Sequence, residues 1–351
     1  MASMPTRHAL GLLLVSSLGL VGVGACSGRR GAAESAQHRA AAATAATATQ
    51  AAQAAQPATT RNAACEGCHA EIAGEWRASL HRDSHSDPMY QRAFAREPLS
   101  FCTGCHAPEA NAHDPGPSAT HALGVGCVTC HQITGEHPSP GRPAQQVAVG
   151  ATNDACAHCH EFRFPGTREL MQLTVTEHRA SPRAASTCAS CHMPKVETAS
   201  ARGRHASHRF DASRDASMIR SAARIKVARA GRTVRFSFEP AGAGHAFPTG
   251  DLFRRLRLVA DLRGAGEARH IESFLGRKTK HAEVLGGTAV NIADDRPFAR
   301  GQPTVAELDV GDPSRPIAWR VVYERVEHPR SRDESDAVVE GAIEVAAGTL
   351  E

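Results

Sequence analysis

The chain has 351 residues, which is room for two domains, but only 4% of them are aromatic, with two Trp and two Tyr. This leaves little large apolar material for ordinary side-chain cores. The formal net charge is +4, yet no basic stripe interleaved with aromatic residues accompanies it, so the sequence excludes a nucleic-acid-binding protein.

Residues 1–25 have the pattern of an export signal. A short basic region with Arg7 and His8 precedes an apolar stretch over 9–23, which is too short for a membrane span. Val23-Gly24-Ala25-Cys26 resembles the lipobox of bacterial lipoproteins. We therefore expect lipidation of Cys26 and a chain anchored at the periplasmic face of a bacterial membrane or at the cell surface. The alternative is an ordinary signal peptide followed by an incidental cysteine.

Residues 26–61 are rich in Ala, Thr and Gln and have no amphipathic stripe that could pack. We predict a tether between the anchor and the folded part, either flexible or partly helical.

Residues 62–217 contain the pattern Cys-x-x-Cys-His five times, and these copies use ten of the eleven cysteines. The pattern is typical of c-type haem attachment, in which two thiols bind the haem and the adjacent imidazole becomes the proximal iron ligand. The predicted attachment residues are Cys65, Cys68, Cys102, Cys105, Cys127, Cys130, Cys156, Cys159, Cys188 and Cys191, and the predicted proximal ligands are His69, His106, His131, His160 and His192.

Paired disulfides or zinc sites are the alternatives, but neither requires a histidine after every second cysteine. The sequence therefore predicts five covalently attached c-type haems. They would replace the missing apolar core, so the haem-free chain should fold poorly. Successive motifs begin 37, 25, 29 and 32 residues apart, which leaves room only for short helices and loops and brings the haems close together.

The predicted fold class is α+β. Within the haem part, 71–80 and 167–180 are the best helix candidates. Beyond residue 217 the apolar residues alternate with period two, which predicts an antiparallel, Ig-like β-sandwich domain over 218–351. Its expected strands are 223–228, 233–238, 256–262, 317–326 and 337–345.

The order of several motifs resembles the multihaem cytochrome c-552/c-554 family. The resemblance rests on the haem motifs with their flanking residues, on His208-Arg209-Phe210 and on the segment Gly244-His245-Ala246-Phe247-Pro248-Thr249-Gly250. It implies an electron carrier or a part of a redox complex, with mostly bis-histidine haems and, in some members, one five-coordinate haem.

Carried over from that resemblance, His81, His208 and His245 are expected to be distal iron ligands. His85 is the rival of His81, and His205 is the rival of His208; the alternative for His245 is a turn residue. Further candidates for the remaining haems are His121 and His178, then His113, His137 and His158, whereas His270, His281 and His328 are expected to be exposed.

Two functions follow from these expectations. The first is electron transfer between redox protein partners outside the cytoplasm. The second is an oxidoreductase that acts on a small nitrogen or sulfur compound at a five-coordinate haem. A third, compatible with either, makes the β-domain a docking module for a larger complex.

Overall fold

The computed structural model describes residues 57–110, 118–132, 148–149, 152–163, 165, 170–198, 203–264, 266–284, 287–312, 314–327 and 336–351. The predicted export signal, Cys26, most of the predicted tether, His113, His137, His328 and the side chain of His281 lie outside them. Residues Ala52–Glu351 form one compact unit. Among the described helices, none combines the length and apolar character needed to cross a membrane.

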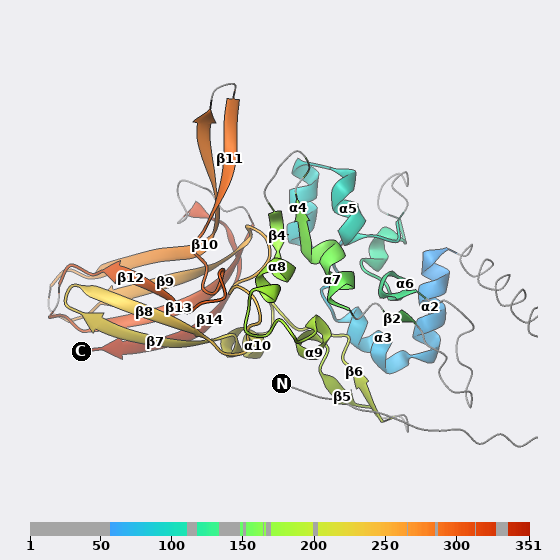
Figure 1. Ribbon diagram of the computed structural model, residues 1–351, viewed down its shortest axis with the longest axis horizontal. Coiled ribbons are helices and arrows are strands. Elements are labelled where there is room, and N and C mark those ends of the chain that lie inside the picture. Colours follow the sequence, from blue (N-terminus) through green and yellow to red (C-terminus); the bar gives the residue numbers. More distant parts are fainter. Residues whose placement is uncertain are drawn as a thin grey trace, which may run out of the picture. The chain divides into compact units, whose positions relative to one another are not determined.

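The described residues between 57 and 221 form short helices joined by loops and two-stranded ribbons (Figure 1). The helices are α2 (Ala58–Cys68), α3 (Ala70–Arg77), α4 (Pro88–Arg96), α5 (Ser100–His106), η1 (His121–Leu123), α6 (Cys127–Cys130), α7 (Asn153–His160), α8 (Thr174–Arg179), α9 (Cys188–His192) and α10 (Ala216–Ser221). The ribbons pair β1 (His131–Gln132) with β2 (Ala148–Val149), β3 (Glu161–Arg163) with β4 (Leu170–Leu173), and β5 (Lys195–Glu197) with β6 (Arg204–Ala206).

The helix predicted over 71–80 is confirmed as α3. The helix predicted over 167–180 is wrong in its first half, because Leu170–Leu173 forms strand β4 and pairs with β3. Helix α8 begins only at Thr174, where the Glu161 carboxylate accepts hydrogen bonds from the backbone N–H groups of Val175 and Thr176, both at 3.0 Å. A carboxylate at this position satisfies amides that the first helical turn leaves unpaired.

From residue 223 onwards the chain forms two antiparallel sheets. One sheet has the order β11-β10-β9-β13-β14 and the other has the order β12-β8-β7. The strands are β7 (Ala223–Ala230), β8 (Thr233–Pro240), β9 (Arg254–Leu262), β10 (Arg269–Val284), β11 (Gly287–Asp294), β12 (Thr304–Asp309), β13 (Ile317–Val326) and β14 (Val339–Leu350).

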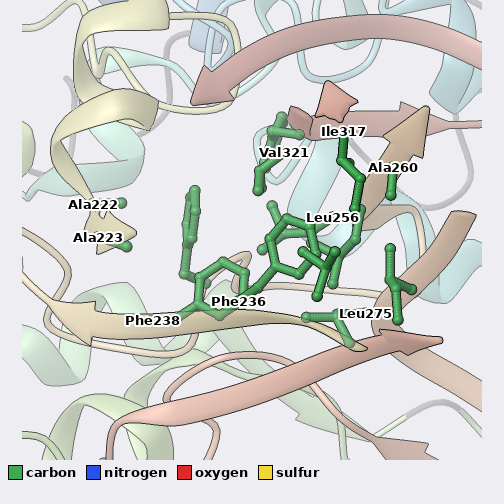
Figure 2. Close-up of a cluster of buried hydrophobic side chains, with 14 of the residues drawn as sticks. Ala222, Ala223, Phe236, Phe238, Leu256, Ala260, Leu275, Ile317 and Val321 are labelled. Atoms are coloured by element: carbon green, nitrogen blue, oxygen red, sulfur yellow. The ribbon is translucent and has the colours of Figure 1, made fainter. Parts of the chain in front are cut away.

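The main hydrophobic core lies between these two sheets. On β8, Val234, Phe236 and Phe238 are fully buried and alternate with polar residues, as expected for a strand with one face on the core. Figure 2 shows Phe236 and Phe238 near Leu256 of β9, which belongs to the other sheet. The mixed helical and antiparallel structure confirms the α+β class, and the Ig-like topology remains a prediction.

The five strands predicted from alternation are all present. Strands β10, β11 and β12 were not predicted. Their sequences carry charged residues on both strand faces or only a short apolar pattern, as in Arg269–Val284 and Thr304–Asp309. These three strands are stabilised by pairing with neighbouring strands. That pairing is a tertiary feature, so the local sequence pattern does not indicate it.

The haem part has little core of its own. Its described apolar cluster consists of Ala58, Trp76 and Leu123. The Trp76 indole N–H donates to the carbonyl of Val125 at 2.8 Å, which ties α3 to the segment before the third Cys-x-x-Cys-His motif. Few apolar side chains pack together here, which agrees with the prediction that a bound group fills the interior of this part.

Candidate haem sites

All five Cys-x-x-Cys-His motifs lie on or at the end of short helices, namely α2, α5, α6, α7 and α9. Residues three apart lie on the same face of a helix, so each pair of thiols points to one side. The histidine ends the helix or follows it directly. In this conformation the two thiols and the imidazole of each motif would hold one haem.

Two asparagines connect motifs that lie far apart in the sequence. The Asn62 side-chain oxygen accepts a hydrogen bond from the Cys127 N–H, and the Asn153 oxygen accepts one from the Cys188 N–H, both at 2.8 Å. Each asparagine lies three residues before the first cysteine of a motif, so it begins the helical turn that leads to that cysteine. Neither asparagine was predicted as a site residue from the sequence. Their common spacing from the first cysteine of a motif, Cys65 or Cys156, was a signal that could have identified them.

The thiols show which motifs are neighbours. The first motif lies beside the third, the second beside the fourth, and the fourth beside the fifth, because cysteine side chains of each two are near enough to shift one another's pKa. The pairs are Cys65 with Cys127, Cys105 with Cys159, and Cys156 with Cys188. All ten described cysteines are free of disulfide bonds. The fourth motif therefore lies beside two others, and the first and third motifs form a further pair.

Three predicted distal histidines face proximal histidines from other parts of the chain. The ring centres are 6.3 Å apart for His81 and His160, 6.0 Å for His208 and His131, and 6.2 Å for His245 and His192. A bond between a metal and an imidazole nitrogen is about 2 Å long, so two imidazoles on opposite sides of one iron have ring centres roughly 6 Å apart. These three separations fit a haem iron between the rings.

Burial keeps these imidazoles neutral. It lowers the pKa of His81 to about 4, with His160 as the next cause, and it lowers the pKa of His245 to about 4. Burial also lowers the pKa of His160 and His192, two of the predicted proximal ligands. Since only a neutral imidazole has a lone pair for a metal, the environment favours the ligating form.

His208 is held by Glu75 of α3. The Glu75 carboxylate accepts a hydrogen bond from the His208 N–H at 2.8 Å and lies 3.1 Å from Nε2 of His205. The Nδ1 atom of His208 lies 2.8 Å from the carbonyl oxygen of Ala206, which leaves Nε2 for the side facing His131. His205, the rival candidate, is instead engaged with Glu75.

The other two distal candidates have different surroundings. His121 lies with its ring centre 4.8 Å from that of His85, and its Nδ1 is 2.9 Å from the Ser118 hydroxyl. His178 has both ring nitrogens against carbonyl oxygens, Nδ1 at 2.8 Å from Gly244 and Nε2 at 2.9 Å from Ser186. These contacts occupy His178 in holding two loops, so they give no support to iron ligation by it.

The second motif has an aromatic neighbour. The Tyr90 ring stacks on the ring of His106, with centres 3.9 Å apart and planes at 16°, and His106 Nδ1 lies 2.7 Å from the carbonyl oxygen of Ser84. The Tyr90 hydroxyl and, on α2 near the first motif, the Arg61 Nε are buried without a hydrogen-bond partner among the described residues. Such orphaned donors fit a site that receives a group with carboxylates of its own, as haem has.

The β-part contributes one predicted site residue, His245, from the loop between β8 and β9. His270 was expected to be exposed, and its side chain is 47% exposed and paired with Asp261. Next to the His245 loop lies a buried ion pair between Glu177 and Arg296 that sequence reasoning did not find. Burial raises the pKa of Glu177, and Arg296 together with the Thr249 hydroxyl opposes this shift.

Comparison with known proteins gives two matches. Residues 64–132 match the family model described as cytochrome c554 and c-prime. The structure is similar to that of a penta-haem cytochrome c552 from Thermochromatium tepidum, with a TM-score of 0.59, 18% sequence identity and coverage of 82% of this chain and 97% of that one. No curated protein matched the sequence. The family match covers only the first part of the haem part, and the structural similarity is one of fold.

Proposed function

We propose that this chain transfers electrons through five covalently attached haems between redox protein partners outside the cytoplasm. The observation that carries the proposal is the set of three histidine pairs with ring centres 6.0–6.3 Å apart. Two imidazoles on one iron leave no open position for a substrate, which favours electron transfer over catalysis.

When bound, the haems would supply the one-electron chemistry. The residues of the chain hold the motifs at fixed positions and keep water away from the buried imidazoles. Cys65 lies beside Cys127, and Cys156 lies beside Cys188, so neighbouring attachment points are side by side. Asn62 and Asn153 fix the same two pairs through the backbone.

Spectroscopy of the as-isolated protein tests this function. We expect only low-spin signals in low-temperature EPR and no optical response to carbon monoxide, nitrite or hydroxylamine. A high-spin haem that binds these molecules would favour the alternative, an oxidoreductase acting on a small nitrogen or sulfur compound. Intact mass should exceed that of the processed polypeptide by five haems, and Cys156→Ala/Cys159→Ala should remove one of them.

Substitution of the proposed ligand from the β-part is the sharper test. His245→Met should change the EPR signal and the midpoint potential of one haem and leave the others unchanged. His270→Asn is the matched control, because His270 lies in the same part of the chain but is paired with Asp261 at the surface. Identical spectra for His245→Met and the parent protein would show that His245 is not a ligand.

The predicted lipid anchor is a separate part of the proposal. It rests on the Val23-Gly24-Ala25-Cys26 sequence, and Cys26 is the one cysteine outside the haem motifs. Cys26→Ala should release the haem-loaded protein from the membrane fraction of the producing bacterium. Retention of the variant in membranes to the same extent as the parent would contradict lipidation as the anchor.

A further inference from the structure

The strongest unassigned feature is a buried ion pair that joins the haem part to the β-part. Glu177 lies on α8, and Arg296 follows β11. Their side chains are 0% and 1% exposed, and Arg296 Nη2 donates to the Glu177 carboxylate at 2.5 Å. Asp294 completes the group, accepting from Arg296 at 2.7 and 2.8 Å. Charges removed this completely from water persist only when they are fully paired and hydrogen-bonded.

The same two side chains hold the loop that carries His245. The second carboxylate oxygen of Glu177 accepts from the Ala246 N–H at 3.2 Å and from the Thr249 hydroxyl at 2.6 Å. Arg296 Nη1 donates to the carbonyl of Pro248 at 2.8 Å. Three of the four residues after His245 are therefore bound by one ion pair.

Residue His178, next to Glu177, holds the other side of the loop. Its Nδ1 lies 2.8 Å from the carbonyl oxygen of Gly244, the residue before His245. A Cβ atom at Gly244 would meet this Nδ1 at 3.2 Å, so the two segments pack closely. Thr174 adds a hydroxyl contact to Thr249 at 2.9 Å. Helix α8 thus contacts the loop both before and after the histidine.

These contacts determine where the His245 ring points. Its Nδ1 lies 2.9 Å from the carbonyl oxygen of Ala246, whose N–H is bound by Glu177. The remaining nitrogen, Nε2, is left for the side on which the His192 ring lies, 6.2 Å away and within 9° of parallel. A shift of the Ala246 peptide would therefore turn the imidazole as well.

We infer that the Glu177–Arg296 ion pair is the positioning device that sets the His245 imidazole opposite His192. The inference rests on the proposed function, in which His245 is a distal ligand of the fifth haem. Under this arrangement the β-part completes a redox centre only when α8 and the segment after β11 have closed on each other. An ion pair that only joined the two parts would not use the second oxygen of its carboxylate to bind the ligand loop.

The test uses the haem-loaded full chain with Glu177→Gln, which keeps the shape of the side chain and removes its charge. We expect the EPR signal and potential of one haem to change, the same haem that His245→Met affects. In the ferrous state the fraction of that haem able to bind carbon monoxide should rise about tenfold or more. Arg179→Gln is the control, because Arg179 lies on the same helix in an exposed pair with Asp154 at 3.3 Å.

Each result decides between the two proposals. Suppose that His245→Met changes one haem, while the folded Glu177→Gln variant has the same haem spectra as the parent. The positioning role of Glu177 is then overturned, and the proposal that His245 is a ligand stands. If neither variant changes a haem, His245 is not a ligand and both ideas fail.

If Glu177→Gln does not fold, Thr249→Val replaces it, since that change removes the hydroxyl that donates to the Glu177 carboxylate. Unchanged carbon monoxide binding in Thr249→Val, with Thr249→Ser as its conservative partner, would then overturn the inference.

Discussion

Asparagines three residues before two of the haem motifs connect distant parts of the chain. Asn153 accepts a hydrogen bond from the Cys188 N–H at 2.8 Å, and its amide donates to the carbonyl of Ser186 at 3.2 Å. Asn62 makes the matching contact to Cys127 and is fully buried. Single side chains of this kind, and not only the covalent attachment, determine which motifs become neighbours.

Removing one of these side chains should weaken the protein measurably. Asn153→Ala loses both hydrogen bonds, so we expect the free energy of unfolding to fall by about 1–2 kcal/mol. Asn153→Asp keeps the acceptor for the Cys188 N–H and should lose less. Chemical denaturation of the haem-loaded protein measures the difference. Equal losses in both variants would contradict a role for the acceptor oxygen.

His270 should make stability depend on pH near neutrality. Hydrogen bonds to Asp261 and then to Glu272 raise its pKa above the ordinary value of about 6.5. A raised pKa means that the folded state binds the proton more tightly, so this stabilisation is complete below about pH 6.5 and is lost as pH rises through the higher folded value.

His270→Asn measures this contribution. Because the ring is 47% exposed, the parent should exceed the variant by less than about 1 kcal/mol at pH 5.5, and the difference should shrink by pH 8.5. Arg232→Gln provides the control, since it removes an exposed ion pair with Asp309 that contains no histidine. A difference for His270→Asn that grows with pH would contradict the assignment.

At the level of elements, the turn before the third motif sets the position of His81. Gly124 has φ of +59°, and a Cβ atom there would collide with the carbonyl oxygens of His81 and Arg82. The neighbouring Val125 N–H donates to the carbonyl of His81 at 2.8 Å. The segment that ends η1 therefore packs directly on the backbone of a proposed distal ligand.

Gly124→Ala should destabilise the protein by about 1–3 kcal/mol and alter the haem attached at the fourth motif, whose proximal ligand faces His81. Gly231→Ala is the matched control: its φ is +60°, but no atom lies within 4 Å of the added Cβ. Thermal unfolding and EPR measure both effects. If the two variants behave alike, backbone strain alone explains the loss, and the packing on His81 has no influence.

Local sequence predicts elements well where one interaction dominates. The five strands predicted beyond residue 217 were correct because alternating apolar residues, such as Val234, Phe236 and Phe238, face one core. Leu170–Leu173 was predicted as helix because leucine, methionine and glutamine favour helices. Its pairing with Glu161–Arg163 overrides that preference, and no local pattern reports a partner strand.

Across the whole molecule, the apolar core is distributed unevenly. The large described cluster lies between the two sheets, whereas the cluster of the haem part has only Ala58, Trp76 and Leu123. This small cluster agrees with the prediction, made from the low aromatic content of the sequence, that bound haems supply the burial in the haem part.

This distribution predicts how the chain behaves without haem. When produced in cells that cannot attach c-type haem, the chain should yield a protease-resistant fragment that begins near residue 217 and retains the β-part. The haem-loaded chain should resist the same protease from about residue 57. Mass spectrometry of the fragments measures both. Equal resistance of residues 62–217 with and without haem would contradict a haem-filled interior.

The sequence by itself predicted the five attachment motifs and their proximal histidines and determined most strands of the β-part, because each depends on residues that are at most four apart. Only the tertiary structure decided which histidines face each other. His81 and His160, or His192 and His245, meet because helices and loops from distant segments pack together. The Glu177–Arg296 pair was equally invisible in the sequence, since a carboxylate and a guanidinium far apart along the chain carry no sign that folding will bury them together.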